Sequence, residues 1–336
     1  MLTRKITATL SALHAVVTLR AMQIFIHIFL VWLATLLTTS AASNATVRVE
    51  SAQPNSPAAV AEAEYNKLIE LDDKAHEQLD KWLRDNAAVQ AQGAGLETAV
   101  LTLKMNQRVE PVKKAYEDFT QRYPQHTRGH LAFGSFLHDA GDEDAAAKHW
   151  EKARELEPQN PAAWDNLGTY YAQRGEVKKA LEYYAKALEL NPQQSVYHHN
   201  LGNVVFHFRK EAMAYFQLSD DHALNLALKH LHTARRLAPD NFKIATDYAQ
   251  AHYAVKPPRF TEAAAAWQQA LKLAKTELER EGVLTHLARV EISAGHFADA
   301  RQYLNTVTNA SLLPLKESLT RALVEKEKPV APKSEP

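Results

Sequence analysis

Histidine is the residue type whose number and grouping first suggest chemistry in this sequence. The chain contains 16 histidines and no cysteine, so a metal site would need imidazole and carboxylate ligands. Two histidines on one helix can share a metal ion when they lie on one face, as at a spacing of four residues. The closest histidines here stand side by side or two residues apart, so their side chains diverge. The sequence therefore predicts no metal site among His198, His199, His207, His222, His230 and His232.

Catalytic side chains form no recognisable arrangement either. The sequence has no thiol, no GxSxG motif and no glycine-rich phosphate loop. Its carboxylates are interleaved with basic residues, as in Glu176, Lys179 and Glu182, which is typical of a solvated helix face. Basic and acidic side chains are equal in number, at 39 each, so nothing indicates a nucleic-acid partner. We therefore expect a non-enzymatic protein without a cofactor.

The clearest spacing pattern lies in residues 161–194. Trp164, Leu167 and Tyr171 recur at intervals that place them on one face of a helix. Small residues between them leave room for a second helix, and a glycine and a proline then end the two helices in turn. The residues that carry the pattern are Trp164, Leu167, Gly168, Tyr171, Ala180, Tyr184, Ala187 and Pro192.

These residues stand at the offsets of a tetratricopeptide repeat, a helix-turn-helix unit of roughly 34 residues, and the chain resembles that family. The resemblance extends over about residues 109–314. It implies an all-α fold, a right-handed α-solenoid of about five repeats with extra amino-terminal helices and a carboxy-terminal capping helix. The repeats are predicted at 127–160, 161–194, 195–241, 242–277 and 281–314, with an insertion near 208–220 in the third.

Helical patterns also flank the predicted repeats. Residues 59–126 are expected to form amino-terminal helices and a half repeat, with separate helices at Leu96–Met105 and Val109–Arg122. A capping helix is predicted at 315–327, because one apolar stripe there is otherwise covered by polar residues. The tail at 328–336 is rich in Pro, Lys and Glu and is predicted to be disordered.

The amino-terminal end has the composition of an export signal. Basic residues precede an apolar run at 24–37, and small residues follow it, which is typical of a cleavable signal peptide at 1–42. A flexible linker is predicted at 43–58. We expect an exported protein, periplasmic or secreted. The alternative is a membrane-anchored envelope assembly factor that keeps 24–37 as an uncleaved anchor, with its repeats outside the cytoplasm.

The resemblance also implies where a partner binds. In the family, the first helices of successive repeats line a concave groove that takes a peptide or a partner helix. The alternative is that these positions are ordinary solvated helix surface. The residues carried over from the family's groove positions are Arg128, His138, Thr169, Gln173, His199, Asn203, Phe206, His207, Lys243, Gln250, Tyr253 and Arg289. The aromatic residues of the insertion, Phe208, Tyr215 and Phe216, are a second candidate surface.

One specific activity of the family is not expected. Its chaperone-tail receptors hold a terminal carboxylate with a lysine at the fifth position of a repeat. That position is occupied here by Leu131, Asp165, His199, Thr246 and Thr285, so the lysine is missing throughout. The pattern also makes Trp164 a predicted packing residue, whose replacement by alanine should cost about 3 to 5 kcal/mol.

Overall fold

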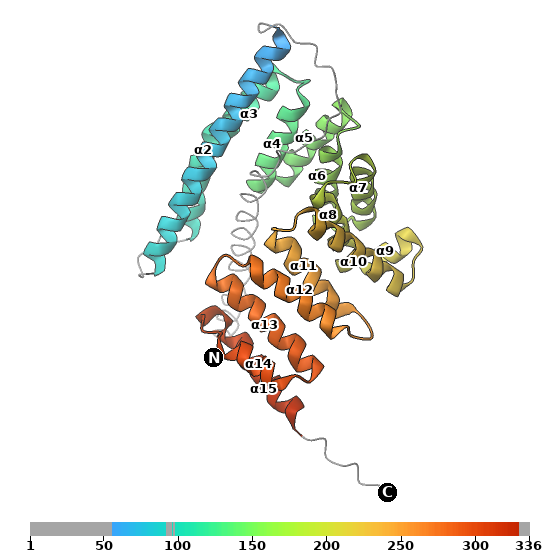
Figure 1. Ribbon diagram of the computed structural model, residues 1–336. Helices are drawn as coiled ribbons and strands as arrows, with labels where there is room; N and C mark the ends of the chain where they lie inside the picture. Colours follow the sequence, from blue (N-terminus) through green and yellow to red (C-terminus); the bar gives the residue numbers. More distant parts are fainter. Residues whose placement is uncertain (1–55, 92–95, 97, 329–336) are drawn as a thin grey trace, which may run out of the picture. The chain divides into compact units, whose positions relative to one another are not determined.

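The computed structural model describes residues 56–91, 96 and 98–328, and its regular elements there are α-helices and short 3₁₀ helices. Fourteen α-helices, α2 to α15, follow one another along this described part of the chain (Figure 1). The all-α fold class predicted from the repeat pattern is confirmed. None of the described helices is long and apolar enough to cross a membrane.

Some predictions from the sequence concern segments outside the described residues. They are the signal peptide at 1–42, the alternative anchor at 24–37, most of the linker at 43–58 and most of the tail at 328–336. All of these stay predictions.

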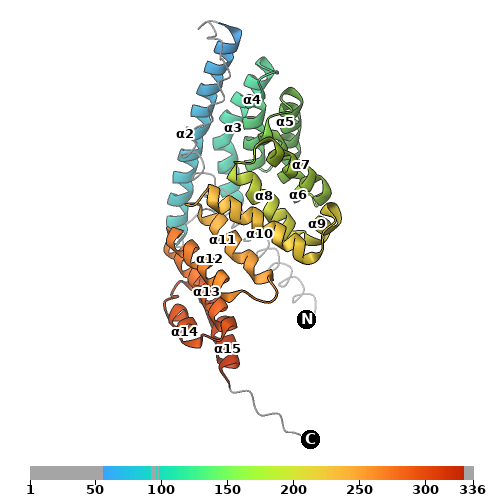
Figure 2. The ribbon, with the colours of Figure 1, turned by 45° about the vertical axis from the view of Figure 1, so that its right-hand side comes forward.

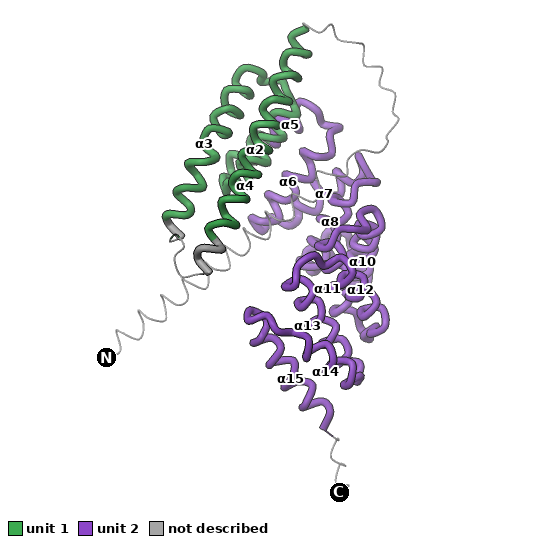
Figure 3. The backbone as a smooth tube through the Cα atoms, turned by 60° about the vertical axis from the view of Figure 1, so that its left-hand side comes forward, with its two compact units in different colours: residues 1–149 green, residues 150–336 purple. Residues whose placement is uncertain are grey.

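The chain divides into two compact units, residues 1–149 and residues 150–336 (Figure 3). The amino-terminal unit is built around Tyr116. Its ring stacks on Phe133 with a centroid distance of 5.3 Å, and its hydroxyl donates a hydrogen bond of 2.6 Å to Oδ2 of Asp72. This one side chain therefore joins three helices. The elements of this unit are α2 (Pro57–Ala91), α3 (Thr98–Arg122), α4 (Thr127–Asp139) and the first part of α5 (Glu143–Leu156).

Helix α3 is longer than predicted. Separate helices were expected at Leu96–Met105 and Val109–Arg122, but one continuous helix contains both stretches, with Pro111 inside it. That prediction was wrong because neither glycine nor proline stands in the gap at 106–108, so nothing there ends the helix. Val112 and Tyr116, each 1% exposed, are packed into the core directly after Pro111 and stabilise the helix there.

The carboxy-terminal unit consists of successive helical hairpins, in which α6 pairs with α7, α8 with α10, α11 with α12 and α13 with α14 (Figures 1 and 2). Helix α15 packs on α13 and α14. The bounds are α6 (Pro161–Gln173), α7 (Val177–Leu190), α8 (Ser195–His207), α9 (Arg209–Phe216), α10 (Asp220–Leu237), α11 (Phe242–Ala251), η1 (His252–Ala254), α12 (Phe260–Leu273), α13 (Glu277–Ala294), α14 (Phe297–Asn305), η2 (Ala310–Leu312) and α15 (Leu313–Glu327).

Local signals set the ends of these helices. The Asn160 side chain accepts a hydrogen bond from the backbone N–H of Ala162, which caps α6. Gly175 follows α6 with φ of 76°, a left-handed conformation that glycine adopts without steric cost. Helix α13 begins at Glu277, before the predicted repeat start at 281, because Thr276 and Glu279 form a capping box.

Glycine at position 202 lets α8 approach α10 closely. A Cβ atom at Gly202 would stand 2.9 Å from Cγ and 3.1 Å from the backbone N of Leu231, which is fully buried. We expect Gly202→Ala to destabilise the protein by about 1–3 kcal/mol, because overpacking outweighs the better helix propensity of alanine. Urea unfolding measures the change.

Gly282 supplies the matched control for that substitution. It also lies within a helix, but nothing stands within 4 Å of a Cβ built there. Gly282→Ala should therefore stabilise the protein by about 0.5–1 kcal/mol through helix propensity alone. Equal effects of the two substitutions would show that close helix approach at Gly202 is not what requires glycine.

Trp164 is less buried than the repeat pattern predicted. Its indole is only partly covered, lies 5.1 Å from the ring of Tyr183 and donates a hydrogen bond of 2.8 Å to the carbonyl oxygen of Pro158. The expected cost of 3 to 5 kcal/mol assumed full burial. A smaller loss is now expected.

Helix α9 lies within the predicted insertion at 208–220 and packs against α7, α8 and α10. Ala212 is fully buried, and Phe208, Tyr215 and Phe216 pack against a core cluster that includes Leu181 of α7. The aromatic residues of the insertion therefore hold α9 onto the hairpins. This packing accounts for them without a partner.

Candidate functional site

The residues proposed to line a groove lie in both units. Two of them, Arg128 and His138, belong to the amino-terminal unit and have partners there. Arg128 pairs with Glu62 of α2 and covers the ring of Tyr65 at 4.5 Å, while Nδ1 of His138 lies 2.8 Å from Oε2 of Glu143. These contacts fasten α4 to its neighbours. The remaining candidates lie in the carboxy-terminal unit.

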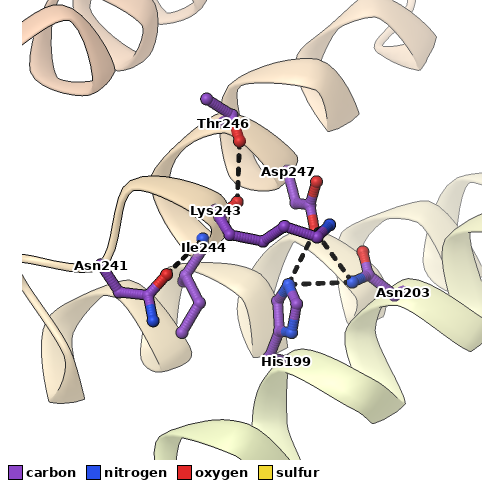
Figure 4. Close-up of polar contacts among 7 residues, drawn as sticks. All are labelled: His199, Asn203, Asn241, Lys243, Ile244, Thr246 and Asp247. Atoms are coloured by element: carbon purple, nitrogen blue, oxygen red, sulfur yellow. Dashed lines mark hydrogen bonds and ion pairs between the residues drawn. The ribbon is translucent and has the colours of Figure 1, made fainter. Parts of the chain in front are cut away.

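Three of those candidates converge on one carboxylate, as Figure 4 shows. Nε2 of His199 lies 2.7 Å from Oδ2 of Asp247, and Nδ2 of Asn203 and Nζ of Lys243 lie 3.2 and 2.7 Å from the same oxygen. Nε2 of His199 and Nδ2 of Asn203 are 2.9 Å apart. We call these four residues the Asp247 cluster. It joins α8 to α11.

Charge explains the state of the carboxylate in this cluster. Burial alone would raise the pKa of Asp247, but the hydrogen bond from His199 and the charge of Lys243 lower the pKa to about 2. Asp247 is therefore ionised throughout the physiological range. Three donors on one oxygen satisfy this anion, which makes the cluster a fixed polar element and not a proton-transfer site.

A second polar contact joins the preceding pair of first helices. Asp165 of α6 is 5% exposed, and Nδ2 of Asn200 in α8 donates to both its carboxylate oxygens, at 3.1 and 3.0 Å. Burial raises the pKa of Asp165 to about 7, although the bond from Asn200 lowers it. The candidate Thr169 accepts a hydrogen bond of 3.0 Å from the hydroxyl of Tyr184. Asp165, Asn200 and Thr169 therefore make contacts between neighbouring helices.

Asp247 is the member of the cluster that the sequence analysis missed. In the repeat register it stands where Asn200 stands one repeat earlier, and both face a polar residue of the preceding first helix. His199 contacts Asp247 on the next first helix, and Asp165 contacts Asn200 on the next first helix in the same way. A polar residue recurring at this position in successive repeats was the available signal.

Tyr253 and Arg289 form a further group with His286. The Tyr253 hydroxyl lies 3.1 Å from Nδ1 of His286, and the Arg289 guanidinium lies 5.7 Å from the centroid of the Tyr253 ring. Burial raises the pKa of Tyr253 to about 12, against the lowering effect of Arg289. Burial, followed by the charge of Arg289, lowers the pKa of His286 to about 4. Tyr253 remains 38% exposed.

The other candidates lie outside these groups. Phe206 and His207 line an open hollow of about 450 Å³, together with Arg209 and Lys210 at the start of α9. The remaining two candidates, Gln173 of α6 and Gln250 of α11, are exposed.

One group of potential metal ligands was not considered from the sequence. Ligand atoms of Glu291, His296 and Asp299 all lie within 4.8 Å of one another at the turn between α13 and α14. Nδ1 of His296 is 2.7 Å from Oε2 of Glu291, and His296 and Asp299 are exposed. The contact between His296 and Glu291 at this turn accounts for the arrangement.

The stacked hairpins define the chain as an α-solenoid repeat protein. Residues 161–194 match the tetratricopeptide repeat family model. The chain therefore contains a tetratricopeptide repeat at 161–194, within a series of helical hairpins that has the fold of tetratricopeptide-repeat structures. No curated protein matches its sequence.

Solved structures with similar folds include several repeat proteins. Pseudomonas aeruginosa pilF matches with 15% identity and a TM-score of 0.51, covering 74% of this chain and 99% of pilF. The APC/C hetero-tetramer Cut9-Hcn1 matches with 18% identity and a TM-score of 0.50, covering 81% of this chain and 48% of the other. YrrB matches with 15% identity and a TM-score of 0.48, covering 64% and 100%. At these identities the likeness concerns the fold.

Proposed function

We propose that the carboxy-terminal unit is a non-enzymatic scaffold that binds an extended acidic peptide of a partner protein across α8, α11 and α13. The fold itself supports a protein–protein interaction scaffold. The observation that carries the peptide proposal is the convergence of His199, Asn203 and Lys243 on Asp247. Side chains already fixed by such contacts lose little freedom on binding.

The charge of this surface favours an acidic partner. The only carboxylate of the Asp247 cluster is already satisfied by three donors. Lys243 has a side chain that is 49% exposed, and an ammonium group carries three donors, of which Asp247 accepts one. Arg289 adds a second cation beside the partly exposed ring of Tyr253. Acidic and aromatic side chains of a peptide match these groups.

A photo-crosslinking residue at position 250 tests this proposal in cells. Gln250 lies on α11 and Gln269 on α12 of the same hairpin, and both are exposed, so position 269 is the matched control. We expect one protein to be captured from position 250 and not from position 269. Equal capture from both positions, or none from position 250, contradicts the proposal.

Neutralising the two cations tests the chemistry of the partner. Lys243→Gln combined with Arg289→Gln should weaken binding of the captured peptide roughly tenfold, because each exposed charge contributes about 0.5–1 kcal/mol. Titration calorimetry with the synthetic peptide measures this, and added salt should produce a similar loss in the parent. Unchanged affinity in low salt argues against an acidic ligand.

The cellular location of the protein depends on its amino-terminal segment. We propose export by the predicted signal at 1–42, and the alternative is an envelope assembly factor anchored by 24–37. Amino-terminal sequencing of the protein from cells distinguishes them, since a mature terminus near residue 43 removes the anchor.

A further inference from the structure

Two pairs of histidines face each other inside helical hairpins. Nδ1 of His130 in α4 lies 2.9 Å from Nδ1 of His149 in α5, and Nδ1 of His198 in α8 lies 2.9 Å from Nδ1 of His230 in α10. The members of each pair come from the two helices of one hairpin. We call these two pairs the histidine clasps.

In the first histidine of each clasp, the contact made by Nε2 determines which ring nitrogen carries the hydrogen. Nε2 of His130 lies 3.1 Å from the carbonyl oxygen of Pro124, and Nε2 of His198 lies 3.1 Å from that of Pro192. A carbonyl oxygen only accepts, so Nε2 must carry the hydrogen and donate it. In a neutral imidazole Nδ1 is then an acceptor. The facing Nδ1 of the second histidine therefore donates.

This arrangement has room for a single hydrogen between the two Nδ1 atoms. A first added proton converts one of the two rings into a partly buried cation. A second would place two N–H groups face to face at 2.9 Å, which breaks the contact. The clasp therefore keeps its hydrogen bond when neither or one of the rings is protonated and loses it when both rings are.

The charges that shift the pKa of the second histidine of each clasp, His149 and His230, are positive. Burial and then the charge of His130 lower the pKa of His149 to about 4, and the ring of Phe133 also packs against it, at 4.4 Å. Burial, then the charges of His198 on α8 and Lys229 on α10, lower the pKa of His230 to about 4. The charged groups that act on these two rings are all basic.

The hairpin between the clasps provides an internal comparison. Trp164 of α6 donates to the carbonyl oxygen of Pro158 as His130 and His198 do to their prolines, and its ring lies 5.1 Å from that of Tyr183 in α7. Neither of these rings binds a proton between pH 7 and 4. The same aromatic contact is thus made by titratable rings in two hairpins and by non-titratable rings in the third.

We propose that the histidine clasps are acid-sensitive contacts that loosen the α4–α5 and α8–α10 hairpins as pH falls, while the α6–α7 hairpin between them in the chain stays closed. The folded state binds a proton at His149 or His230 less readily than the unfolded state, whose pKa is near 6.5. Stability from the clasps is therefore complete above about pH 6.5 and is lost as pH falls toward about 4.

Amide hydrogen exchange of the full chain at pH 7 and pH 4.5 tests this proposal. After correction for intrinsic exchange rates, we expect protection in α10 to fall on the order of tenfold or more, because open states gain the proton more readily. Protection in α7 should change by less than about threefold. We take α7 and not α6 as the reference because Asp165, which lies in α6, has a pKa raised to about 7 and therefore titrates in this pH range. Parallel changes in α7 and α10 overturn the proposal.

Variants separate the clasps from general acid unfolding. His198→Trp with His230→Tyr copies the rings of the α6–α7 hairpin and should abolish the acid response of α10 while leaving that of α5. His230→Phe is smaller and serves if the larger rings do not fit. His232→Gln, an exposed position on the same helix, is the control and should respond as the parent does. An unchanged acid response of α10 in His230→Phe overturns the proposal.

Discussion

Replacing Trp267 by alanine is expected to lower the free energy of unfolding by about 3–5 kcal/mol. Trp267 is 1% exposed and stacks on the ring of His286, with centroids 4.1 Å apart and planes 2° apart. It lies in the core cluster shared by α11, α12 and α13, which includes the buried Leu284 and Leu287. Its removal leaves a cavity that such a packed cluster fills only in part. Urea denaturation monitored by circular dichroism measures the loss.

Trp164→Ala is the control variant for Trp267→Ala, and the free energies of unfolding of the two variants should be compared. The two tryptophans have the same chemistry, but Trp164 is only partly buried, so its loss should cost no more than about 2 kcal/mol. The order of the two variants is the test. If Trp164→Ala proves as costly as Trp267→Ala, burial does not decide the energetics of these repeats.

Replacing Asp165 by asparagine should stabilise the protein at pH 8. Burial raises the pKa of Asp165 from 3.8 to about 7, so the folded state holds this proton more tightly than the unfolded state. The cost of ionising the buried carboxyl is therefore absent below about pH 4, grows as pH rises and is complete above about pH 7. Removing the charge should gain about 2–4 kcal/mol at pH 8. Asn200 can still donate to the amide oxygen.

The difference in stability between Asp165→Asn and the parent should be measured at several pH values, so that contributions of other groups cancel. Asp247→Asn is the control with the opposite sign. The pKa of Asp247 is lowered to about 2, so its ionised form stabilises the fold and the substitution should destabilise it at neutral pH. A difference for Asp165→Asn that stays constant from pH 4 to pH 8 contradicts the assigned pKa.

The fold class was predictable because the repeat pattern is local. Leu167, Ala180 and Tyr184 recur at spacings that only a helix-turn-helix hairpin brings onto one buried face, and all three are buried in the structure. The continuous helix α3 was not predictable in this way. The short polar gap at 106–108 interrupts the apolar pattern without ending the helix, so the pattern alone could not distinguish one helix from two.

The contacts of the candidate site depend on the register between hairpins. His199 and Asn203 were named from their own helix, but Asp247 is 48 and 44 residues away from them in sequence. The histidine clasps were missed for the same reason. His198 and His230 were each compared with neighbours on one helix, whereas they meet across a hairpin at a separation of 32 residues.

The hydrogen bond from a ring nitrogen to a proline carbonyl limits which residues can replace Trp164. Phenylalanine or tyrosine could fill a similar volume, but neither has a ring N–H to give to the oxygen of Pro158. Among the common amino acids only histidine and tryptophan have an aromatic ring with that donor. His130 and His198 at the equivalent positions are therefore functional equivalents of tryptophan, and relatives of this protein should interchange these two residues there more readily than residues of closer size.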